Sequence, residues 1–109
     1  MYPSISEQST QGGRLTRHMP NSRDSAVEQA RNDLAKRLKI DAAGVKEKSV
    51  EDSDFPDMAL GAAEDGEMSG QMITRGWRIN LEAQGKTFEY RADKNQVRAY
   101  KFKGKNYRI

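Results

Sequence analysis

The sequence predicts a single α+β domain in which one N-terminal helix packs on a curled, four-stranded antiparallel sheet with meander connections. Three observations predict it: a helical stripe of apolar residues over 25–39, alternating apolar and polar residues over 77–92, and turn residues between the later apolar runs. A chain of 109 residues supports one domain, which we place at residues 24–109.

Residues 1–23 have the composition of a disordered, basic tail. They contain a Gly-Gly pair, two prolines and several Ser and Gln residues, with almost no hydrophobic periodicity. The tail is basic through Arg14, Arg17, His18 and Arg23. We interpret it as a solvated segment, and an electrostatic arm for nucleic acid is the alternative.

The helix is expected to begin at Ser25 and to end near Lys39. The sequence Ser25-Ala-Val-Glu28 fits a capping box, in which the serine oxygen accepts from an amide three residues on and the glutamate reaches back. Apolar side chains then recur at spacings of three and four, and this stripe would cover the sheet: Val27, Ala30, Leu34 and Leu38.

The first strand is expected over 45–55, as an irregular or bulged edge strand. Its apolar positions are only Val45, Val50 and Phe55, and the charges between them oppose pairing with another sheet edge. A long acidic loop follows over 56–69. Its carboxylates are not spaced as in a calcium-binding loop, so we interpret it as solvated.

The hairpin over 77–92 is the most strongly specified element. A two-residue Gln84-Gly85 turn puts nearly every apolar side chain on one side of the pair, and a one-residue slip would turn that set toward water. The facing pairs are Ala83 with Lys86, Leu81 with Phe88, Ile79 with Tyr90 and Trp77 with Ala92. Gly76, just before Trp77, indicates a bulge or bend.

The last predicted strand, 97–103, follows a turn over 93–96, and its facing stays open. Pairing Ala92 with Val97 buries Val97 and Ala99 and leaves Arg98, Tyr100 and Phe102 on the opposite face. A bulge near Gln96 would bury Tyr100 and Phe102 instead. A further turn at Gly104-Lys105 would lead to a short final segment.

Charge is distributed unevenly, although the net charge is only +3. Residues 40–69 carry nine acidic against two basic side chains, and residues 86–109 carry eight basic against two acidic ones. The two regions are expected either to attract one another or to face different partners.

Catalysis is not expected. The chain has no cysteine, and its one histidine, His18, lies in the tail, so the usual Ser-His and Cys-His nucleophiles and Cys-based zinc sites are excluded. Nothing near the carboxylates of Asp54 and Asp57 promises the burial that would raise one pKa. We expect no cofactor and no metal. No apolar run is long enough to span a membrane and no export signal is recognisable, and the localisation stays undetermined. We expect a monomer.

The stretch FPDMALGAAEDGEMSGQMITRGWRINLEAQGKTFEYR, residues 55–91, resembles a family of small uncharacterised bacterial domains. That family's pattern runs Trp-Pro-Asp, Ser-Leu-Gly-Cys-Pro, Gly and Gln, Gly-Tyr-x-Ile-x-Leu, and Gly-x-x-Tyr-x-Tyr-His. The matching positions here are Phe55, Pro56, Asp57, Leu60, Gly61, Gly66, Gln71, Gly76, Trp77, Ile79, Leu81, Gly85, Phe88 and Tyr90. Ala62 stands where the family has a cysteine, and Arg91 stands where it has the histidine.

The resemblance implies a helix on a curled antiparallel sheet, similar to cystatin-like or PepSY-like domains, which host inhibitors, binding modules and folding helpers. Relatives often carry envelope or lipoprotein leaders, but the disulfide that the family implies is absent here because its cysteines are missing.

Two functions follow as hypotheses. The first is a non-enzymatic protein- or peptide-binding or structural module, with an inhibitor-like role as one form, whose candidate loop residues are Pro56, Asp57, Leu60 and Gly61. The alternative is single-stranded nucleic-acid binding through interleaved basic and aromatic residues: Arg98, Tyr100, Lys101, Phe102, Lys103 and Lys105.

Overall fold

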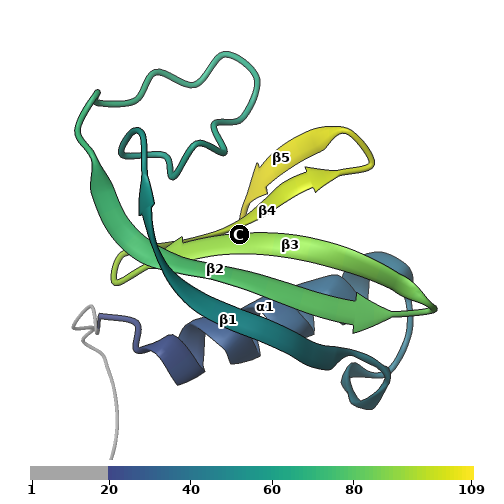
Figure 1. Cartoon of the computed structure of the whole chain (residues 1–109). Coiled ribbons are helices and arrows are strands. Elements are labelled where there is room, and N and C mark those ends of the chain that lie inside the picture. The colour runs from purple at the N-terminus through teal and green to yellow at the C-terminus, as the bar shows by residue number, and fades with distance from the viewer. Residues whose placement is uncertain (1–19) are drawn as a thin grey trace, which may run out of the picture.

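The computed structural model describes residues 20–109 and consists of one helix followed by an antiparallel meander in the order β1-β2-β3-β4-β5 (Figure 1). The elements are α1 (Arg23–Leu38), a 3-10 turn η1 (Ala42–Gly44), β1 (Lys46–Phe55), β2 (Thr74–Ala83), β3 (Lys86–Asp93), β4 (Gln96–Phe102) and β5 (Lys105–Arg108). The α+β class is confirmed. The tail predicted over residues 1–23 lies, up to residue 19, outside the described residues.

The predicted count of four strands is wrong, because the final segment forms a fifth strand. Lys103 and Gly104 both have positive φ, 50° and 85°, which is the backbone of a tight two-residue hairpin turn. This turn brings Lys105 beside Phe102 and Tyr107 beside Ala99. No helix within residues 20–109 is long and apolar enough to span a membrane.

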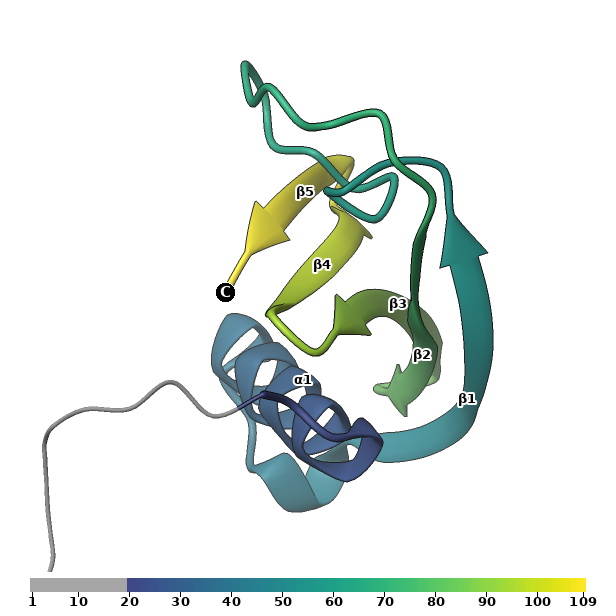
Figure 2. The ribbon, with the colours of Figure 1, turned by 90° about the vertical axis from the view of Figure 1, so that its left-hand side faces the viewer.

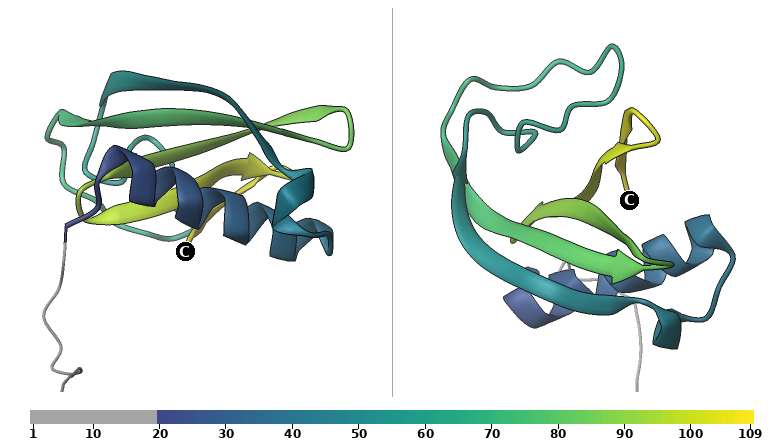
Figure 3. Two further views of the ribbon diagram at one scale, coloured as in Figure 1. Left: turned by 90° about the horizontal axis from the view of Figure 1, so that it is seen from below. Right: turned by 45° about the vertical axis from the view of Figure 1, so that its right-hand side comes forward.

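The sheet curls around α1, with β1 at one edge and β5 at the other (Figures 2 and 3). The predicted irregular edge strand is confirmed, since the register between β1 and β2 shifts between Glu47 and Ser49. Gly76 is needed for a close backbone approach, because a Cβ there would lie 2.1 Å from the carbonyl oxygen of Ala92.

The start of α1 differs from the prediction, because Ser22 rather than Ser25 is the N-cap. The Ser22 hydroxyl accepts from the Ser25 amide at 3.1 Å, and the Ser25 hydroxyl accepts from the Ser22 amide at 2.9 Å. The preceding residue, Asn21, donates its amide to the carbonyl of Lys94 at 2.8 Å. The first turn is therefore fixed against the β3–β4 turn.

The register predicted for the central hairpin is confirmed in all four pairs. Gln84 and Gly85 have φ of 54° and 75°, so they form the two-residue turn, and Ala83 pairs with Lys86. The apolar face of the hairpin packs under α1. The shared core includes Leu34, Ile79, Leu81, Tyr90, Ala92, Val97 and Ala99.

One polar contact lies at the border of this core. The Tyr90 hydroxyl, on a side chain that is only 1% exposed, donates to Asp33 at 2.7 Å, and Asp33 also accepts from Arg37. Burial raises the pKa of Tyr90 well above its usual value, and the neighbouring carboxylate raises it further.

The last long strand combines parts of both alternatives. Ala92 pairs with Val97, and Val97 and Ala99 are buried. The alternation then breaks at Lys101, whose φ is 52°, within a register shift between β4 and β5. Phe102 consequently packs on the helix side against Phe88, with ring centroids 5.9 Å apart.

Candidate functional site

Four arginines form a row across the face of the sheet that points away from α1. They are direct cross-strand neighbours on β2, β3, β4 and β5, and we call them the arginine row: Arg78, Arg91, Arg98 and Arg108. Like charges in adjacent positions destabilise a sheet unless they are compensated. Glu89 compensates two of them, because it accepts from Arg78 at 3.2 Å and from Arg91 at 2.8 Å.

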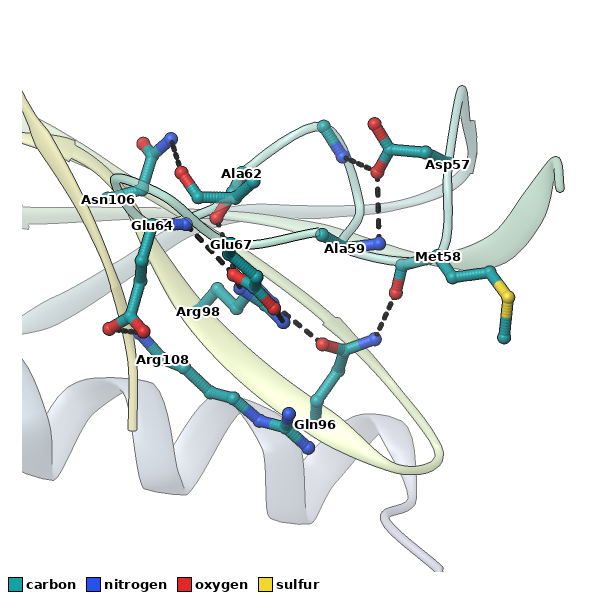
Figure 4. A network of polar contacts seen from close by, with 12 residues as sticks. Asp57, Met58, Ala59, Ala62, Glu64, Glu67, Gln96, Arg98, Asn106 and Arg108 are labelled. Atoms are coloured by element: carbon teal, nitrogen blue, oxygen red, sulfur yellow. Dashed lines mark hydrogen bonds and ion pairs between the residues drawn. The ribbon is translucent and has the colours of Figure 1, made fainter. Parts of the chain in front are cut away.

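The loop over 56–73 compensates Arg98 and adds a contact to Arg91. Arg98, only 2% exposed, donates two hydrogen bonds to the carboxylate of Glu67, at 2.6 and 2.7 Å, and a third to the carbonyl of Ala62 (Figure 4). Arg91 donates to the carbonyl of Leu60 at 3.0 Å and stacks on Tyr100, 3.6 Å from the ring centroid. The loop is therefore held on the sheet by directional polar contacts.

Glu67 is the acidic side chain on which these contacts centre. Its hydrogen bonds from Arg98, together with its bond from the amide of Glu64, lower its pKa to about 2. Glu64 in turn accepts from the amide of Arg108 on β5 (Figure 4). The acidic middle and the basic end of the chain thus contact each other, which is the first of the two arrangements expected from the charge pattern.

The predicted loop residues mostly build the loop itself. Leu60 is fully buried, and Gly61 has φ of 64° with Pro56 and Arg91 packed against it. The carboxylate of Asp57 accepts from the amides of Ala59 and Gly61 (Figure 4). Only Pro56 is exposed. Whether these residues also contact a partner stays a prediction.

A groove of about 670 Å³ lies where this loop meets the start of β2 and the β3–β4 turn. Four apolar side chains line it: Met58, Met72, Ile73 and Trp77. Met58 is 50% exposed, Met72 64% and Ile73 72%. Sequence reasoning missed Met58, Met72 and Ile73 because they lie in a stretch without periodicity. The only signal was the presence of large apolar residues in a segment expected to be polar.

The walls of the groove are fixed by hydrogen bonds between the loop and β4. The Gln96 side chain donates to the carbonyl of Met58 at 2.8 Å (Figure 4). The Met58 amide donates to the carbonyl of Gly70 at 2.9 Å. Asp93, 6% exposed, accepts from the Asn95 amide and from Gln96, which closes the β3–β4 turn. The groove is therefore largely preformed.

The carboxylates considered in the sequence analysis are engaged in local contacts. Among residues 20–109, no three His, Cys, Asp or Glu side chains gather as a metal site. The Asp54 carboxylate lies 3.6 Å from Arg75, and Asp57 is used within the loop.

The structure separates the residues of the predicted nucleic-acid surface. Arg98 is buried beneath the loop, and Tyr100 lies under Arg91 on the same face. Phe102 packs on the opposite face, so the two aromatic rings do not form one stacking platform. The exposed members of the set are Lys101, Lys103 and Lys105.

The comparisons with known proteins identify a family. Residues 27–100 match the family described as Domain of unknown function (DUF8738). The chain belongs to this family. The expected relationship to a family of uncharacterised small domains is thus confirmed. The match to DUF8738 runs from within α1 to within β4, so it includes the loop and the groove. No curated protein and no solved structure matches the chain.

Proposed function

We propose that this DUF8738 domain is a non-enzymatic protein- or peptide-binding module and that its binding site is the groove between the 56–73 loop, β2 and the β3–β4 turn. The supporting observation is the exposure of Met58, Met72 and Ile73 around Trp77. Contiguous exposed apolar side chains within a polar surface are typical of interaction sites. Methionine suits such a site, because its unbranched side chain adapts to the surface it contacts.

The folded state supports this proposal in a second way. The loop residues next to the groove are held by buried contacts, since Leu60 and Ala62 are fully buried and Arg98 bonds to Glu67 below them. A site whose backbone is already ordered loses less conformational entropy when a partner binds. An inhibitor-like role is the narrower form of this proposal, with the loop inserted into a partner's cleft.

Single-stranded nucleic-acid binding ranks second. Its remaining support is the exposed lysines of the β4–β5 hairpin. The buried ion pair of Arg98 and the opposite facing of Tyr100 and Phe102 weaken it.

The test is selection of peptides from a random dodecapeptide phage library against the intact chain. Selected peptides are then measured by calorimetry with the wild type and with Ile73→Asp, which places a charge in the groove. We expect micromolar affinity for the wild type and at least a tenfold loss in the variant.

The matched control is Met68→Asp, because Met68 is 94% exposed in the same loop but does not line the groove. It should bind like the wild type. Selection of no peptide, or equal losses in both variants, would contradict the proposal. Binding of single-stranded oligonucleotides that weakens with salt, and that Lys103→Glu abolishes, would favour the second function.

A further inference from the structure

The start of β2 extends past the end of β3. The last pair between the two strands is Trp77 with Ala92, whereas β2 continues to Thr74 and pairs there only with β1. Continuing the register would put Lys94 opposite Arg75, but Lys94 lies in the β3–β4 turn. The groove lies at this point, with Arg75 and Lys94 in its lining.

The antiparallel hydrogen-bond pattern indicates which backbone groups at the start of β2 are unpaired. In an antiparallel pair, bonded and non-bonded residue pairs alternate, and the pair flanking a two-residue turn is bonded. Ala83 with Lys86 is that flanking pair, so every second residue of β2 from Ala83 back to Trp77 bonds to β3. Arg75 is the next residue in this series. Its N–H and C=O therefore point away from β1, toward the groove, and the described contacts give them no backbone partner there.

The charges around the groove differ in how far they are compensated. The Arg75 guanidinium lies 3.7 Å from Asp52 and 3.6 Å from Asp54, and the Asp93 carboxylate is bound within its own turn. Lys94 is exposed and forms no ion pair within residues 20–109. The charge that complements this groove is therefore a carboxylate next to the apolar side chains.

We propose that the groove binds an extended peptide segment as an added β-strand. The segment bonds to the backbone of Arg75, places apolar side chains against Trp77 and Ile73, and directs an acidic side chain to Lys94. This inference rests on the proposed function and specifies its binding mode. The N–H and C=O of Arg75 then set the direction and register of the segment, and its alternating side chains supply the specificity.

The test uses the tightest dodecapeptide from the selection, synthesised unmodified and as analogues with one N-methylated amide each. Because Arg75 is the only residue of β2 whose N–H and C=O are left unpaired on this side, N-methylation of the one peptide amide that bonds to its carbonyl should lower affinity at least tenfold. Methylation at the other positions should change the affinity less than threefold. Hydrogen exchange of the Arg75 amide in the intact chain should slow at least tenfold on binding.

The charge is tested with Lys94→Glu, which should weaken binding of an acidic peptide at least tenfold. Lys105→Glu, on the distant β4–β5 hairpin, is the matched control and should leave binding unchanged. If peptides bind in the groove but tolerate methylation everywhere and do not protect Arg75, the added-strand mode is wrong and the binding function stands. If no peptide is selected, both are wrong.

Discussion

The two faces of the sheet are stabilised in different ways. On the α1 face, the contacts are mostly apolar: Leu34, Ile79 and Leu81 are fully buried in one cluster. On the other face, a loop without regular structure is held over the arginine row by ion pairs and by bonds to its carbonyl groups. The first kind of contact depends on buried area, and the second depends on charge and direction.

This difference explains how so small a domain keeps a preformed groove. A single helix covers only one face of a five-stranded sheet, and the loop over 56–73 covers the far end of the other (Figure 1). The apolar side chains that the loop buries are only Ala59, Leu60 and Ala62, and arginines hold the loop by its backbone. Apolar side chains that the loop does not bury, such as Met72 and Ile73, stay available at its edge.

The largest expected effect is on the helix face. Ile79→Ala removes a fully buried side chain from the centre of the core and should lower the free energy of unfolding by about 2–5 kcal/mol. Urea unfolding followed by Trp77 fluorescence measures this loss. Ile73→Ala is the matched control, because Ile73 is 72% exposed and should change the free energy by less than about 0.5 kcal/mol. Similar losses in both variants would contradict the assignment of the core.

A smaller and more local effect is expected on the loop face. Arg98→Ala removes the bonds to Glu67 and to the carbonyl of Ala62 and should cost about 2–3 kcal/mol. Its diagnostic result is faster hydrogen exchange at amides of the loop, with the α1 amides less affected. Arg75→Ala, at an arginine whose side chain is 70% exposed, should leave loop exchange unchanged. Unchanged loop protection in Arg98→Ala would show that apolar contacts hold the loop.

The smallest expected effect is on the pH dependence of stability, and it comes from Glu67 on the loop face. The pKa of Glu67 is lowered from 4.5 to about 2 by its bonds from Arg98 and from the Glu64 amide. Because the folded-state pKa lies below the unfolded one, the contribution is fully present above about pH 5 and is lost as the pH falls toward 2. The shift corresponds to about 3 kcal/mol, and solvent screening at this partly exposed side chain lowers the expected contribution to about 2 kcal/mol.

The variant that isolates this contribution is Glu67→Gln. It should be less stable than the wild type at neutral pH and should lose less stability between pH 5 and 2, as measured by urea unfolding at each pH. Parallel pH profiles for the two proteins would contradict the role of this ion pair.

Local patterns in the sequence are enough to predict the helix-facing half of this domain. The alternation over 77–92 and the Gln84-Gly85 turn gave the hairpin register, because a shift by one residue would expose the whole apolar face. The apolar stripe through Val27 and Leu34 predicted the covering helix, because side chains at spacings of three and four lie on one face of a helix. These are local periodicities, so one sequence is enough to recognise them.

The loop-facing half depends on contacts between segments that are distant in the sequence. The arginine row exists because four strands bring together residues far apart in the sequence, and its partner Glu67 comes from a loop without a pattern. The opposite facing of Tyr100 and Phe102 follows from a single residue, Lys101, that breaks the alternation. The groove likewise forms where three separate segments meet: the loop, the start of β2 beyond the end of β3, and the β3–β4 turn. Contacts of this kind depend on which distant segments become neighbours, and hydrophobic periodicity carries no information about that.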